Sequence, residues 1–170
     1  MKVRFAIHIL GAVFLSLSLS PLAAPQKPPL IEKLSVVGTQ RMTSQRSLID
    51  DLVGRNFGSG FNGNKTHDIA LLQRALDRRL VTSQQTPELQ AMGIILGDLL
   101  AADLGMHWVV YQDHLGRSKA LRYRETDNYL FPVTMISRRR EVDNREPVVE
   151  IYQKAYDIVI AAQKKPAPLQ

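Results

Sequence analysis

The stretch HWVVYQDHLGRSKALRYRETDNYLFPVTMI, residues 107–136, decides the predicted fold. Its apolar and polar residues alternate, which is typical of strands with one buried face, and its length suits three short strands. Asp113 and Gly116 take the first and fourth positions of a hairpin turn, and a second turn is expected at residues 125–128. Residues 129–136 are apolar on both faces, which predicts a sandwiched third strand with Pro132 at an edge or a bulge.

Helical periodicity flanks this stretch on both sides. Apolar residues recur at helical spacing in residues 43–57, 66–81, 86–104 and 147–163. Thr43 or Ser44 is expected to cap the first of these helices, Thr66 to cap the second, and Gly105 to end the third. The sequence therefore predicts an α+β domain, in which N-terminal helices pack on a three-stranded antiparallel meander and a C-terminal helix follows.

The first 24 residues resemble an export signal. Lys2 and Arg4 form a basic start, residues 5–19 are mainly apolar, and small residues lead up to Ala24. We expect cleavage after Ala24, a periplasmic or secreted location, and no membrane span in the mature chain; a retained membrane anchor is the alternative. Further along, residues 25–42 are predicted to be an extended linker, residues 43–163 a single α+β domain, and residues 164–170 a disordered tail.

Composition excludes several kinds of chemistry. The chain has no cysteine, so it has neither a disulfide nor a thiolate metal site. Its formal net charge of +6 is mild, and without a clustered basic patch it does not predict a nucleic-acid partner.

The loop GSGFNG, residues 58–63, matches the dinucleotide pattern G-x-G-x-x-G. That pattern binds a pyrophosphate only where a strand turns into a helix, whereas here a helix precedes the glycines. We therefore expect no nucleotide and no other cofactor, and interpret the loop as a helix-to-helix connection that could also serve as a lid. Ser59 lies in this loop without a G-x-S-x-G pattern, so the sequence does not predict a serine nucleophile.

Glycines also occur inside the third predicted helix. Gly93 and Gly97 are four residues apart, so they lie on one face of that helix. We interpret them as positions where another backbone packs closely, with a dimer interface as the alternative.

Residues 89–141 carry a set of motifs: LG before the strands, then WV, D with GR, ALR, FP, MI, and a basic pair followed by Glu. Together these motifs resemble the bacterial family of domains of unknown function 3806. The resemblance implies a small α+β domain with no established activity, and it implies no catalytic residues.

Four arginines are the candidate binding residues: Arg122, Arg124, Arg138 and Arg139. The first two share one face of the predicted second strand, and the other two follow the predicted third strand. Guanidinium groups at neighbouring strand ends suit a carboxylate or a phosphate. Alternatively, these arginines lie over the sheet and pair with acidic residues nearby.

Two classes of function remain from the sequence. The favoured one is a non-enzymatic interaction domain that binds an unknown protein or an anionic component of the cell envelope. The alternative is a small metal-dependent hydrolase that uses His107, Asp113 and His114, because histidine with carboxylate suits zinc.

Overall fold

The computed structural model describes residues 27–164 and confirms the α+β class. The expected signal and its cleavage site lie outside these residues, as does nearly all of the expected tail. In chain order the elements are β1 (Leu30–Lys33), α1 (Val36–Phe57), α2 (Lys65–Asp77), α3 (Thr86–Leu104), β2 (Met106–Asp113), β3 (Gly116–Tyr123), β4 (Tyr129–Leu130), the 3-10 helix η1 (Pro132–Thr134), α4 (Ser137–Glu141) and α5 (Val148–Gln163).

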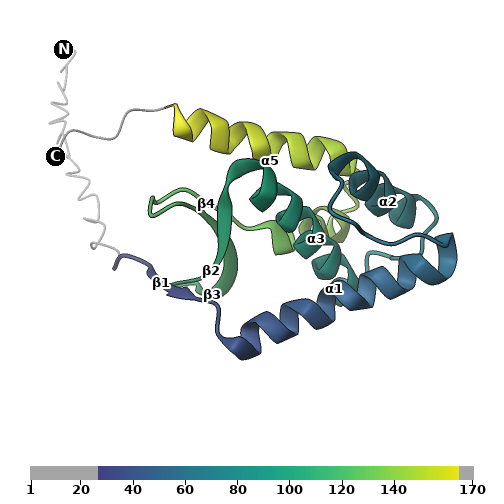
Figure 1. Ribbon diagram of the computed structural model, residues 1–170, viewed down its shortest axis with the longest axis horizontal. Coiled ribbons are helices and arrows are strands. Elements are labelled where there is room, and N and C mark those ends of the chain that lie inside the picture. The colour runs from purple at the N-terminus through teal and green to yellow at the C-terminus, as the bar shows by residue number, and fades with distance from the viewer. Residues whose placement is uncertain (1–26, 165–170) are drawn as a thin grey trace, which may run out of the picture.

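Helix α3 lies in the middle of the molecule (Figure 1). Helices α1 and α5 pack on opposite sides of it, α2 packs against α5, and the sheet stands at one end. Most residues of α3 are buried, from Leu89 to Leu104, because the helix is apolar around its whole circumference. Even so, no helix within residues 27–164 is long and apolar enough to cross a membrane.

The sheet has four antiparallel strands in the order β1-β2-β3-β4, one more than the sequence predicts. The additional strand is β1, in which Ile31 pairs with Tyr111 of β2. Helix α1 then begins at Val36, capped by the Ser35 hydroxyl, which accepts from the Gly38 N–H at 3.0 Å. Residues 25–42 are therefore not simply an extended linker. Their order depends on a strand about 80 residues away, and no local pattern indicates such pairing.

The predicted third strand is the other correction. Only Tyr129 and Leu130 form β4, and the chain then enters η1 and α4. Pro132 has no N–H for a ladder hydrogen bond, so the strand stops before it. The apolar residues that follow include the buried Ile136, and they pack against the core from a short helical connection instead of from a strand.

The two glycines of α3 allow this connection to pack closely. A Cβ at Gly93 would lie 2.5 Å from the carbonyl oxygen of Pro132, and a Cβ at Gly97 would lie 2.5 Å from Cζ2 of Trp108. Neither distance leaves room for a side chain. The interpretation of Gly93 and Gly97 as close-packing positions is confirmed.

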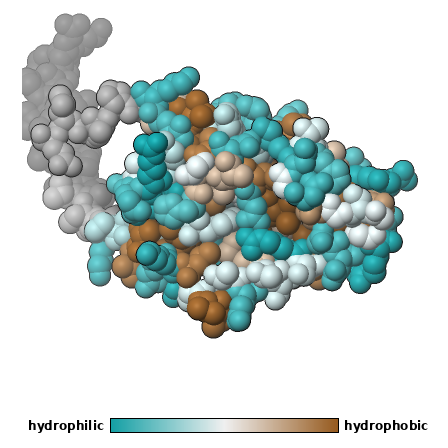
Figure 2. Space-filling model, viewed as in Figure 1, coloured by the Kyte–Doolittle hydropathy of each residue, from teal (hydrophilic) through white to brown (hydrophobic). Residues whose placement is uncertain are grey.

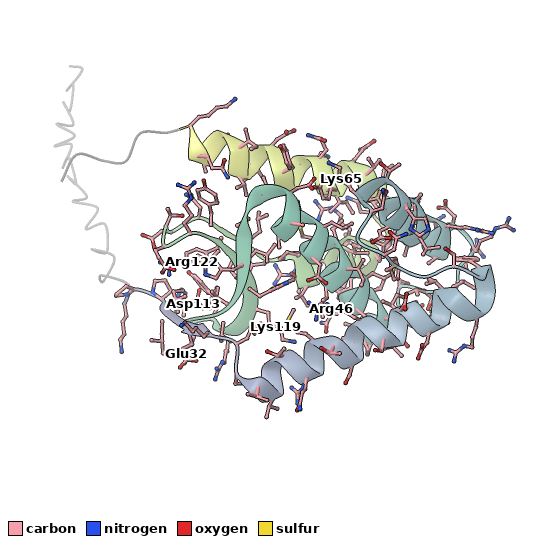
Figure 3. The ribbon with its side chains drawn as sticks, viewed as in Figure 1. Glu32, Arg46, Lys65, Asp113, Lys119 and Arg122 are labelled. Atoms are coloured by element: carbon pink, nitrogen blue, oxygen red, sulfur yellow. The ribbon has the colours of Figure 1, made fainter. Side chains whose placement is uncertain are left out.

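Trp108 lies between the sheet and α3, where its indole is partly buried against the core. Its Nε1–H donates to Oδ1 of Asp98 at 2.9 Å. Arg46 of α1, which is labelled in Figure 3, donates to both oxygens of the same carboxylate, at 2.6 and 2.8 Å. Asp98 therefore connects α1, α3 and the sheet.

Apolar side chains remain at the surface near the sheet and the start of α1 (Figure 2). Leu30, Val36 and Val37 are all more than half exposed there. Elsewhere on the face shown in Figure 2, polar side chains interrupt the apolar surface.

Candidate anion-binding site

Arg122 has a structural partner in the turn between β3 and β4. Its guanidinium donates to the backbone carbonyls of Thr126 (2.8 Å) and Glu125 (3.0 Å) and to the Glu125 carboxylate (2.6 Å). The side chain is only 16% exposed, so this arginine holds the turn against the sheet. Its acidic partner, Glu125, belongs to this turn. This agrees with the alternative interpretation, in which the arginines pair with acidic residues nearby.

The other three candidate arginines do not join Arg122 in one site. Arg139 is engaged by Glu146 (2.5 Å) and by the Met135 carbonyl (2.7 Å). Arg124 is exposed on the turn with its guanidinium 5.0 Å from the ring centre of Tyr123. Arg138 lines a separate cavity of about 340 Å³ beside Tyr111 and Phe131. The predicted cluster of four arginines is therefore divided, because Arg138 and Arg139 lie on α4 instead of at a strand end.

The alternative metal site is not assembled. His107 is near the start of β2 and Asp113 is at its end, so the two are roughly 20 Å apart along the strand. Asp113 instead caps the hairpin turn, where its carboxylate accepts from the Leu115 N–H at 2.8 Å. Among the residues that the structure describes, no group of three His, Cys, Asp or Glu side chains is placed to hold a metal ion.

A different set of arginines meets in a cavity of about 400 Å³, which we call the arginine basin. One wall comes from the end of α2 and the loop after it, and the other from α4 and the loop that leads to α5. The lining residues are Gln73, Leu76, Asp77, Arg79, Val81, Thr82, Ser83, Arg140, Asp143 and Arg145.

Arg140 and Arg79 are the free cations of the basin. Neither forms an ion pair or a side-chain hydrogen bond with any residue from 27 to 164. Burial lowers the pKa of Arg140 below its ordinary value, and the neighbouring Arg145 lowers it as well, while Asp77 and Asp143 act in the opposite direction. Arg140 is thus a half-buried charge that no protein group within this range neutralises directly.

The rim of the basin contains two residues in an unusual backbone conformation. Arg79 and Asp143 have φ values of 55° and 53°, in the left-handed region that favours glycine. Each follows the end of a helix: the N–H of Arg79 bonds to the Leu76 carbonyl and that of Asp143 to the Arg140 carbonyl. These bonds belong to Schellman motifs, in which glycine is the usual residue.

Helices α1 and α3 end differently, with Gly58 and Gly105, both at a φ of 63°. The two helix ends at the basin therefore carry side chains at a conformational cost of about 1 kcal/mol each. Arg79 and Asp143, the two residues at these helix ends, both line the arginine basin. Such backbone strain is often found at functional sites.

Sequence reasoning did not identify Arg79, Arg140 and Arg145 as a group. Arg140 directly follows the candidates Arg138 and Arg139, but Arg79 lies inside the predicted helix of residues 66–81, so no local signal marks it. Their meeting could not be foreseen, since α2 and α4 are about 60 residues apart in the chain and approach only through the packing on α3.

Comparison with known proteins gives a family and a fold. The sequence profile of the family "Domain of unknown function (DUF3806)" matches residues 68–152, which include every residue that lines the basin. No curated protein matches the chain.

One similar solved structure is a crystal structure from Bacteroides thetaiotaomicron VPI-5482 at 1.50 Å resolution. It superposes with a TM-score of 0.70 and is 18% identical, over 79% of this chain and 49% of the other. At this identity the likeness shows the fold alone. This chain spans about half the length of that protein.

Proposed function

We propose that this chain, which belongs to the DUF3806 family of domains of unknown function, is a binding domain that takes an anionic group of its partner in the arginine basin. The observation that carries the proposal is Arg140, a half-buried guanidinium without a carboxylate partner, placed in a cavity with Arg79 and Arg145. A carboxylate or phosphate in the basin would neutralise it. Planar guanidinium groups bind both anions through paired hydrogen bonds.

The composition of the basin sets the kind of anion that fits. Its three arginines are accompanied by Asp77 and Asp143, so the cavity carries only a small positive excess. The Asp77 carboxylate already accepts from Gln73 (2.8 Å), and the exposed Arg145 pairs with Asp143 (3.1 Å). The basin therefore suits a single phosphate or carboxylate group, held by Arg79 and Arg140, better than a polyanion such as nucleic acid.

The proposal includes export of the chain and assigns the basin a binding role, with no reaction in the basin itself. The basic start, apolar run and small residues of positions 1–24 support export. Lipid head groups, wall peptides and acidic protein surfaces would then be the available anions. Mass spectrometry of the secreted or periplasmic fraction tests export directly: a first residue at position 25 supports it, and a chain that keeps residues 1–20 contradicts it.

Inorganic phosphate at low ionic strength tests the basin. We expect millimolar phosphate to raise the melting temperature of the wild-type domain and to produce a saturable calorimetric signal. Arg140→Gln and Arg79→Gln should each remove that signal. Arg124→Gln is the matched control, since it removes an exposed arginine outside the basin and should leave the signal unchanged. A wild-type protein that shows no response, or a control that loses it equally, contradicts the proposal.

A further inference from the structure

The glycine loop after α1 brings three polar side chains into a line. Ser59 Oγ lies 3.1 Å from Nε2 of His67, and Nδ1 of the same ring lies 2.8 Å from Oδ1 of Asp68. Serine, the two ring nitrogens and a carboxylate thus follow one another in the order used by serine nucleophiles and their general bases. These two contacts, one to each ring nitrogen, orient the His67 side chain.

The carboxylate at the end of this line is fixed. Asp68 is 2% exposed, and its two oxygens also accept from the backbone N–H groups of Asn62 (3.1 Å) and Gly63 (2.8 Å). A carboxylate that accepts from two backbone donors offers only acceptor sites to the ring, so Nδ1 of His67 carries a proton. Nε2 then has its lone pair directed at the Ser59 hydroxyl, which is the arrangement a general base requires.

The loop that carries Ser59 is itself held in place. Asp50 of α1 accepts from the Phe61 N–H at 2.8 Å, so three consecutive N–H groups of the loop bond to carboxylates. The N–H groups of Ser59 and Gly60 bond to no acceptor among the described residues. As unoccupied donors on the loop that carries the serine, they are the candidates for an oxyanion hole in the site proposed below.

We propose that Ser59, His67 and Asp68 form an acyl-transfer site, with Ser59 as nucleophile, His67 as general base and Asp68 as the positioning residue. The substrate class is a carboxylic ester, because an alcohol leaves more readily than an amine, and the 37% exposure of the His67 side chain leaves the ring open to it. The site is separate from the arginine basin, and it goes beyond the binding role proposed above. It also departs from the sequence-based expectation of a domain without catalysis.

The proposed reaction follows the geometry. Ser59 Oγ bonds to the ester carbonyl carbon while its proton moves to Nε2 of His67. The bond to the leaving alcohol then breaks, and the alcohol oxygen takes that proton. Water next attacks the acyl-serine, gives a proton to His67, and releases a carboxylic acid as Ser59 regains its hydrogen. Each step conserves atoms and electrons, and water is the only co-reactant.

A fluorophosphonate probe, which phosphonylates activated serines, tests the nucleophile without knowledge of the natural ester. Intact-mass and peptide analysis of the folded full chain should locate one adduct on Ser59. Ser59→Ala should show no adduct, and His67→Gln should label at least about 100-fold more slowly. Ser47→Ala, which removes an exposed serine of α1 outside both sites, should label like the wild type.

Circular dichroism of each variant establishes that it is folded before labelling is compared. Asp68→Asn should also label more slowly than the wild type, because the ring then loses the carboxylate that orients it. A folded wild type that stays unlabelled overturns the proposal, as does an adduct on another residue or a His67→Gln variant that labels at the wild-type rate. Phosphate binding by the basin is unaffected by any of these outcomes.

Discussion

Two regions of the molecule use glycine in opposite ways. Where α3 meets η1, the chain carries Gly93 and Gly97 at positions where a Cβ would collide with its neighbours. At the ends of α2 and α4 it carries Arg79 and Asp143 in a conformation that glycine adopts more easily. In the first region, glycine is required because the neighbouring atoms leave no space for a Cβ. The second retains side chains against a local preference, which supports the role proposed for the basin, although Arg124 of the β3–β4 turn does the same outside it, with a φ of 49°.

Gly93→Ala should break the packed region. The new methyl group would overlap the carbonyl oxygens of Pro132 and Val133, and backbone atoms cannot move aside as the end of a side chain can. We expect a loss of about 3 kcal/mol in the free energy of unfolding, measured by urea denaturation. Gly54→Ala is the control, since a Cβ there meets nothing within 4 Å and alanine favours the helix. Equal stability of the two variants would contradict the packing role of Gly93.

Arg122→Ala should cause the next largest loss. This arginine ties two carbonyls and a carboxylate of the β3–β4 turn to the sheet, and two of those acceptors are backbone groups with fixed positions. We expect a loss of about 1–2 kcal/mol, limited by the high exposure of Glu125. Arg124→Ala, on the same turn, should be close to neutral. A variant as stable as the wild type would assign Arg122 to binding instead of to the fold.

The ion pair between Glu146 and Arg139 should make stability depend on pH, whereas Arg140 has no such partner. Hydrogen bonds from Lys154 and Arg139 hold the pKa of Glu146 below its ordinary value of 4.5. Because the folded pKa is the lower one, this stabilisation is present above about pH 4.5 and is lost as the pH falls through the folded value. Thermal melts of Glu146→Gln should therefore change less with pH below 4.5 than those of the wild type. Parallel curves for the two proteins would contradict the assignment.

Arg79→Gly should have the smallest effect on stability and the opposite sign. Glycine relieves the left-handed conformation but gains freedom in the unfolded chain, so we expect a gain of no more than about 1 kcal/mol. The same variant should lose phosphate binding. Calorimetry of unfolding and of phosphate titration checks both effects on one sample. A clear loss of stability would show that the Arg79 side chain supports the fold.

The sequence by itself determined the helices whose apolar stripes are local. Val148–Gln163 lies where its periodicity predicts it, because it buries a face that repeats every three to four residues. Thr86–Leu104 is marked instead by Pro87 at its start and Gly105 at its end. The hairpin of β2 and β3 was equally readable, since Asp113 and Gly116 specify their turn. The close packing at Gly93 and Gly97 also followed from spacing alone.

Tertiary structure decided what depends on partners distant in the chain. Strand β1 exists only through its pairing with β2, and the arginine basin exists only because α2 and α4 meet beside α3. The line from Ser59 to Asp68 is local, yet it depends on a loop shape that Asp50 of α1 holds in place. A periodic pattern records which residues become buried; it does not record which charges lose their partners or which side chains a folded loop brings together, because those contacts are set by the packing of whole elements.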